Sequence, residues 1–162
     1  MSRRDKPTTL KLLVVDDDES VRKVLATILE EEGYAVDTAK NGREDIKKSK
    51  VKFYNLALIG IRLTDMEGTK LLTRVKDTMP KMRKIIITGY PSLQNAIEAV
   101  NRGADAYVLK PFDMEKVLET IKDQLKKQEE EKRYTQKKVG EFIETRVKEL
   151  EEEKTITHKK PR

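Results

Sequence analysis

The chain has 162 residues, a formal net charge of +6, and 36% hydrophobic and 40% charged side chains. This length suffices for one ordinary domain with a buried core and some excess, and the absence of cysteine excludes disulfide bonds and thiolate metal sites. No apolar run approaches the roughly 20 residues that span a bilayer, and the N-terminus lacks the apolar core of a secretory signal, so we expect a cytoplasmic protein without a membrane partner.

The positive charge is spread along the chain. Residues 1–9, 10–126 and 127–162 each carry a net charge of +2. A nucleic-acid interface normally requires a clustered basic face, so we do not expect nucleic acid as a partner.

Short apolar runs alternate with longer segments in which apolar residues recur at helical spacing. The expected strands are residues 12–15, 35–38, 56–61, 85–88 and 107–109, and the expected helices are residues 20–32, 42–49, 67–77, 93–101 and a last helix that starts after Asp113. This alternation predicts an α/β fold with a parallel sheet.

Helix boundaries carry local signals. Gly33 suits the C-terminus of the first helix, Met79-Pro80 breaks the third, and Asp113 is a good N-cap for the last. We expect function at the carboxyl ends of the strands, as in other open parallel sheets.

Four strand ends carry the residues that suggest a chemistry. Val14-Val15 runs into Asp16-Asp17, the third strand contains Gly60 next to its last residue, the fourth ends at Thr88, and the fifth runs into Lys110-Pro111. In this order and spacing, over about residues 10–126, they resemble the receiver domain of two-component response regulators. The resemblance implies a doubly wound, flavodoxin-like sheet of five parallel strands in the order 2-1-3-4-5, followed by a C-terminal helical extension.

The resemblance also implies a phosphate pocket. Asp16 and Asp17 would hold a divalent ion, usually magnesium, together with the backbone carbonyl of Arg62. Lys110 and Thr88 would contact the phosphoryl group, and Lys110 could neutralise the acid pair. Thr88 would act with Tyr107 as a switch, and a cis bond is expected between Lys110 and Pro111.

Gly60 departs from this pattern. The family places its phosphorylated aspartate eight residues before the glycine that is Gly68 here, which points to Gly60. Glycine has no side-chain oxygen, so it can neither form an aspartyl phosphate nor bind the ion. We therefore expect weak magnesium binding, no catalytic residue, and a non-enzymatic pseudo-receiver that signals by protein–protein contact.

Two alternatives remain open at this position. Another residue, among Asp18, Thr64 and Asp65, could accept the phosphoryl group, which would make the chain a phosphorelay intermediate. The glycine could also be an acceptor-site variant of a normal response regulator. A third function, direct DNA binding, ranks lowest because the 36 residues after Lys126 are too few for a winged-helix output domain.

The resemblance suggests a protein partner, either a histidine kinase or a downstream effector, bound through residues 93–126 and the tail, with a homodimer as an alternative. We divide the chain into a flexible N-terminus (1–9), a receiver-like domain (10–126), a charged helical extension (127–154) and a disordered tail (155–162). In the extension, apolar residues spaced three and four apart form one stripe: Val139, Phe142, Ile143, Val147 and Leu150. The extension is either a solvated continuation of the last helix or a short coiled-coil or docking helix.

Overall fold

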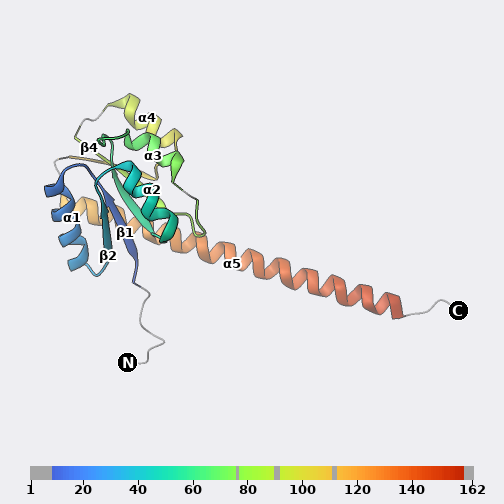
Figure 1. The fold of residues 1–162 in the computed structure, drawn as a ribbon. Coiled ribbons are helices and arrows are strands. Elements are labelled where there is room, and N and C mark those ends of the chain that lie inside the picture. Colours follow the sequence, from blue (N-terminus) through green and yellow to red (C-terminus); the bar gives the residue numbers. More distant parts are fainter. Residues whose placement is uncertain (1–8, 76, 90–91, 111–112, 159–162) are drawn as a thin grey trace. The chain divides into compact units, whose positions relative to one another are not determined.

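The computed structural model describes residues 9–75, 77–89, 92–110 and 113–158 (Figure 1). Within this part of the chain, five strands and five helices alternate: β1 (Lys11–Val15), α1 (Glu19–Glu31), β2 (Ala35–Ala39), α2 (Gly42–Val51), β3 (Leu56–Gly60), α3 (Gly68–Arg74), β4 (Arg83–Thr88), α4 (Leu93–Asn101), β5 (Ala106–Leu109) and α5 (Met114–His158). All neighbouring strands pair in parallel, in the order β2-β1-β3-β4-β5. The predicted fold class is therefore confirmed.

The sheet has two apolar faces because successive side chains of a strand point in opposite directions. One face, which includes Leu13 and Ile59, packs against residues of α2, α3 and α4. The other face, which includes Leu12 and Leu58, packs against α1 and the first turns of α5. The central strand β3 is buried along its whole length, as expected for a strand covered on both faces.

Side-chain caps explain where several helices begin. The Oδ1 atom of Asp18 accepts hydrogen bonds from the backbone N–H groups of Ser20 (2.8 Å) and Val21 (3.2 Å) at the start of α1. At the start of α5, the N–H group of Glu115 donates to Asp113 Oδ1 at 3.1 Å, which confirms the predicted N-cap. Gly33 follows α1 with φ of +95°, the left-handed conformation that glycine adopts most readily.

Two helix boundaries differ from those predicted by more than two residues. Helix α3 ends at Arg74, before the predicted residue 77, because Val75 takes an extended conformation (ψ 137°) and is buried in the core. Met79-Pro80 therefore does not end this helix. Helix α5 continues to His158, past the predicted start of the disordered tail at residue 155, since no proline occurs in the sequence between Met114 and Pro161.

Three predictions concern residues that the structure does not describe. The cis bond predicted between Lys110 and Pro111 involves Pro111, which lies outside the described residues. The same holds for residues 1–8 of the N-terminus and 159–162 of the tail. Among the described residues, the peptide bond between Met79 and Pro80 is cis.

The chain divides into two compact units, Met1–Gln128 and Glu129–Arg162. In the second unit, the side chains of residues 129–155 are all exposed. No described helix combines the length and the apolar character that crossing a membrane requires.

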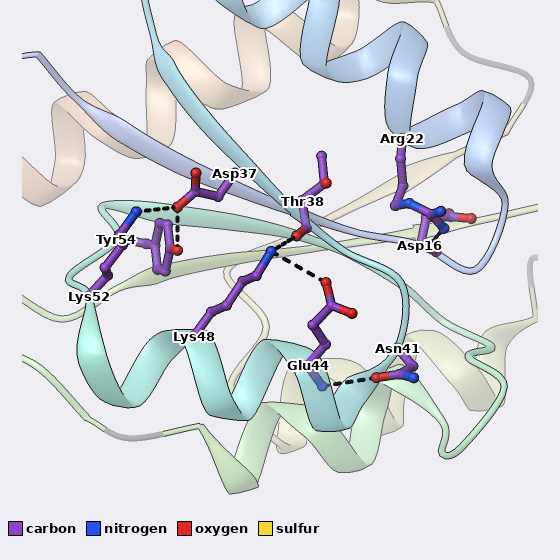
Figure 2. A network of polar contacts seen from close by, with 9 residues as sticks. All are labelled: Asp16, Arg22, Asp37, Thr38, Asn41, Glu44, Lys48, Lys52 and Tyr54. Atoms are coloured by element: carbon purple, nitrogen blue, oxygen red, sulfur yellow. Dashed lines mark hydrogen bonds and ion pairs between the residues drawn. The ribbon is translucent and has the colours of Figure 1, made fainter.

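Polar contacts tie α2 to the edge strand β2 (Figure 2). Asp37 accepts hydrogen bonds from the Tyr54 hydroxyl at 2.6 Å and from Lys52 Nζ at 3.3 Å. The bond from Tyr54, helped by Lys52, holds the pKa of Asp37 below its usual value although partial burial opposes this. Lys52 and Tyr54 follow α2; within the helix itself, Lys48 Nζ donates to the carbonyl of Thr38 and pairs with Glu44 at 3.3 Å.

A buried carboxylate lies on the inner side of α2. Asp45 is 0% exposed; its Oδ1 accepts a bond from Ser49 Oγ at 2.9 Å, whereas its Oδ2 has no hydrogen-bond partner within the described residues. Burial raises the pKa of Asp45 from 3.8 to about 6, and Ser49 and the Lys84 ammonium only partly oppose this. Lys84 is itself buried and donates to the carbonyl of Leu72 at 3.0 Å.

We predict that Asp45→Asn changes the pH dependence of stability. Because the pKa of Asp45 is higher in the folded state, the folded chain binds the proton more tightly, and stability falls as pH rises from about 4 to about 6. The variant lacks this loss, so its free energy of unfolding should gain on the parent by on the order of 3 kcal/mol between about pH 4 and pH 7. Urea unfolding at several pH values measures this gain. An equal slope for Asp45→Asn and the parent would refute the prediction.

Candidate functional site

A cavity of about 510 Å³ lies at the carboxyl edge of the sheet. It is lined by Asp16, Asp17, Gly60, Ile61, Arg62, Ile87, Thr88, Gly89 and Lys110. The parallel order of β1, β3, β4 and β5 brings their ends together at this edge, where the strand order reverses between β1 and β3. Of the site residues predicted from the sequence, only Tyr107 does not line this cavity.

Asp16 is the buried anion of the cavity, with 1% of its surface exposed. Its Oδ2 pairs with Lys110 Nζ at 3.1 Å, and its Oδ1 accepts the N–H group of Asp18 at 2.9 Å. Its backbone carbonyl accepts a bond from Arg22 Nη1 at 2.6 Å, as Figure 2 shows. Asp17 is exposed. The Asp16–Lys110 pair therefore joins the end of β1 to the end of β5.

Gly60 lies against the Asp16 carboxylate. A Cβ atom added at Gly60 would be 3.0 Å from Asp16 Oδ2 and 3.4 Å from the carbonyl oxygen of Val15. The first of these distances is tighter than ordinary van der Waals contact. A side chain at position 60 therefore requires the Asp16 carboxylate to move by a few tenths of an ångström.

The loop after β3 folds back on the strand. Arg62 and Glu67 form an isolated antiparallel bridge, and the N–H group of Gly68 donates to the carbonyl of Ile61 at 2.6 Å. A Cβ atom at Gly68 would lie 2.2 Å from the carbonyl oxygen of Gly60, a contact that no side chain can make. Gly68 is thus required by the close approach of two backbone segments.

Asp18, Thr64 and Asp65, considered above as other acceptors, do not line the cavity. Asp18 caps α1. The carboxylate of Asp65 accepts the N–H groups of Gly42 and Arg43, both at 2.9 Å, at the start of α2. Asp18 and Asp65 therefore have structural roles at helix N-termini.

Thr88 and Tyr107 line different cavities. Thr88 is buried beside Asp16 and Lys110, whereas Tyr107 lines a cavity of about 750 Å³ formed by α4, β5 and α5. The hydroxyl of Tyr107 is buried and has no hydrogen-bond partner within the described part of the chain. Exposed apolar side chains line this second cavity, namely Leu93 (78%) and Leu109 (48%).

No group of three or more His, Cys, Asp or Glu side chains that could hold a metal ion occurs among the described residues. In the cavity, the carboxylates are those of Asp16 and Asp17, and one oxygen of Asp16 is paired with Lys110.

The sequence reasoning missed Arg22 and the capping role of Asp65. Arg22 lies six residues after Asp16, on the first turns of α1, and nothing in the local pattern indicates that its guanidinium turns back to the strand end. Asp65 caps a helix that begins 23 residues earlier, a pairing that only the tertiary fold creates.

These features define an open, doubly wound α/β domain with a carboxylate–lysine pocket at its topological switch point. The model of the family "Response regulator receiver domain" matches residues 12–122, and the chain therefore belongs to this family.

Relatives support the assignment. The transcriptional regulatory protein ZraR of Klebsiella oxytoca is 37% identical over 114 residues, which cover 70% of this chain and 26% of ZraR. A CheY-like response regulator receiver domain protein from Methanospirillum hungatei JF-1 has 44% identity and a TM-score of 0.73, covering 76% of this chain and 99% of that one. The beryllofluoride-activated NtrC4 receiver domain, determined in solution as a dimer, has 39% identity and a TM-score of 0.68, covering 73% and 98%. The chain spans about a quarter of the length of ZraR.

We predict that Gly68→Ala strongly destabilises the fold, while Gly89→Ala does not. The added methyl group would collide with the Gly60 carbonyl at position 68, but at position 89 it would only touch Lys110 Cβ at 3.6 Å. The expected loss is about 2 kcal/mol or more for Gly68→Ala and within about 0.5 kcal/mol of zero for Gly89→Ala, measured by chemical unfolding. Equal stabilities of the two variants would show that the loop does not press on β3 as described.

Proposed function

We propose that this chain is a receiver-like module of a two-component system that lacks the phospho-acceptor aspartate and works by protein contact, without catalysis. The observation that carries the proposal is Gly60, which lies in the cavity with Asp16, Thr88 and Lys110 and has no nucleophilic atom. The polar residues that the resemblance assigns to a phosphate pocket line the same cavity, which supports the proposal.

The contact between Gly68 and Gly60 supports the assignment of the acceptor position. The resemblance places the acceptor eight residues before this glycine, and the α-carbon of Gly68 packs on the carbonyl of Gly60. The sequence spacing thus corresponds to a fixed spatial relation at the end of β3. An alternative acceptor is less well supported, because Asp18 and Asp65 are used as helix caps.

The ion pair of Asp16 with Lys110 gives the pocket a structural role in the absence of phosphate. It neutralises a carboxylate that is 1% exposed, and a buried charge without a partner would be strongly destabilising. We infer that the pocket persists as an ion-paired element of the fold.

The donor set does not fit a tightly bound magnesium ion. Magnesium prefers carboxylate and carbonyl oxygens, but Asp16 is engaged by Lys110 and position 60 offers no carboxylate. We propose weak magnesium binding through Asp16, Asp17 and the carbonyl of Arg62.

For the partner, we propose a protein that binds the face formed by α4, β5 and the first turns of α5. Leu93, Ile97, Val100 and Leu109 expose apolar surface there, around the cavity that Tyr107 lines. Clustered exposed apolar groups commonly mark protein interfaces. The NtrC4 receiver domain was determined as a dimer, so a second copy is a candidate beside a histidine kinase or an effector, and we propose the cytoplasm as the location.

A second candidate is that the chain is an acceptor-site variant of a normal response regulator. It is favoured by the arrangement of Asp16, Thr88 and Lys110 around the position that lacks only a carboxylate. The two candidates share the prediction below and differ in how phosphorylation of Gly60→Asp affects the function of the chain.

We predict that the chain gains no phosphoryl group when incubated with acetyl phosphate and magnesium, whereas Gly60→Asp does. The aspartate would supply the missing nucleophile beside Lys110 and Thr88. Intact mass spectrometry measures the added mass, and peptide mapping locates it.

Gly60→Asn is the matched control, because asparagine has the same size but no nucleophilic carboxylate. Labelling of the unmodified chain would overturn the pseudo-receiver proposal, and the labelled residue would become the site. Labelling of both position-60 variants would place the acceptor elsewhere.

The same three proteins test the metal proposal. We predict that Gly60→Asp binds magnesium at least about tenfold more tightly than the chain or Gly60→Asn, because a further carboxylate oxygen is a good ligand for this ion. Isothermal titration calorimetry measures the affinities. Equal affinities of all three would show that position 60 does not face the ion site.

A further inference from the structure

The helical extension of α5 presents an apolar stripe that the receiver fold does not need. Val139, Phe142, Ile143, Val147 and Leu150 recur at spacings of three and four and are each 45–70% exposed. At 100° per residue, Val139, Ile143, Val147 and Leu150 fall within about 40° of one line along the helix. Such a stripe is stabilised when another apolar surface covers it.

The charges around the stripe are arranged in two opposite segments. The basic segment, residues 132–138, contains four basic side chains and no acidic one; the acidic segment, residues 149–153, contains four glutamates and no basic residue. Their midpoints are residues 135 and 151, so Ile143 lies halfway between them, in the middle of the apolar stripe.

We propose that this segment pairs with the same segment of a second copy of the chain, antiparallel and centred on Ile143. In this arrangement residues 132–138 of each copy, with a net charge of +4, lie beside residues 148–154 of the other, whose four glutamates and two lysines give a net charge of −2. Arg133 then meets Glu153 and Lys137 meets Glu149, while Lys132 and Lys138 meet Lys154 and Lys148, so the contact is attractive on balance at both ends. Parallel pairing in register would place basic beside basic and acidic beside acidic, which is repulsive.

The central residues agree with a two-fold axis at Ile143. Each residue then meets the one equally far on the other side of position 143, so Val139 meets Val147, and Gln136 meets Leu150. Arg146, which borders the stripe, meets Gly140. A Cβ atom at Gly140 would have no neighbour within 4 Å, so the helix itself does not require glycine, but a long arginine side chain from the second copy would use that room.

The charged segments make the contact long enough to be specific. From residue 132 to 153 the paired helices would extend over about 33 Å, roughly three heptads. The exposed ion pairs within the helix, Arg133 with Glu129, Lys138 with Glu141 and Arg146 with Glu149, do not oppose this, because exposed pairs contribute little and exchange readily. If the stripe bound an unrelated protein, the charged segments would not need to be placed symmetrically about the apolar centre.

Disulfide trapping in the full chain tests the orientation, since the chain has no cysteine of its own. We expect an equimolar mixture of Gln136→Cys and Leu150→Cys chains to form the mixed disulfide under mild oxidation, in at least about tenfold excess over either homodimer. Thr145→Cys, on the opposite face of the helix, should cross-link with neither. Gln136→Cys cross-linked mainly to itself would show parallel pairing and overturn the proposal.

Sedimentation of the full chain tests whether the apolar centre and the charge pairs stabilise the contact. Ile143→Glu should weaken self-association by about a hundredfold, because it places two glutamates at the centre of the contact. Arg133→Glu with Lys137→Glu should also weaken it, because these residues meet Glu153 and Glu149 of the second copy. Adding Glu149→Lys and Glu153→Lys to that variant should restore it, since the charges of the two pairs are then reversed.

Salt dependence of the unmodified chain gives a test without substitutions. Salt screens charges, so self-association that depends on opposite charges weakens as the salt concentration rises. Parallel pairing, which brings like charges together, would instead become stronger. A monomer at all concentrations, or stronger association in high salt, would overturn the proposal. The inference is independent of the proposed function. Leu93→Lys, which changes the proposed partner face formed by α4, β5 and the first turns of α5, should therefore leave the mixed disulfide unchanged.

Discussion

The close approach of the Gly68 α-carbon to the carbonyl of Gly60 is the constraint on which the rest of the site depends. It pins the loop after β3 against the end of the most buried strand, and it leaves no room for a side chain at position 68. The loop carries Asp65, which reaches α2, so the same contact also determines where α2 begins relative to the sheet. A single backbone-to-backbone contact therefore positions one wall of the cavity and one helix.

Electrostatics complete the cavity in a way that does not depend on phosphate. The buried Asp16 is held by Lys110, by the N–H group of Asp18 and, through its carbonyl, by Arg22. Lys110 directly follows β5, Asp18 lies in the loop after β1 and Arg22 lies on α1, so these contacts link parts of the fold that are up to 94 residues apart. The charged residues around position 60 thus have a role in the fold itself. The buried Asp45 is different: it lies away from the cavity, and its raised pKa reflects burial.

The fold could be predicted because its signals are local. The alternation of strand-like and helix-like patterns identifies the elements, and the four strand ends fix the order of the sheet by resemblance. The convergence of Asp16, Gly60, Thr88 and Lys110 follows from parallel topology alone. The hydrogen bonds of Arg22 and Asp65 could not be predicted, since they join residues whose proximity only the folded loop creates. The predicted end of α3 was wrong because the chain buries Val75 in an extended conformation, and this outweighs the helical periodicity. The local sequence pattern does not reveal that burial.

Glycine at position 60 changes the time scale on which the proposed module can respond. In a receiver that is modified covalently, the duration of the signal is the lifetime of the modified state. Where position 60 carries no reactive atom, the lifetime of any complex is set by its dissociation rate, and its occupancy by the free concentrations of the two partners. Such a module reports how much partner is present at each moment, and it retains no memory of an earlier stimulus.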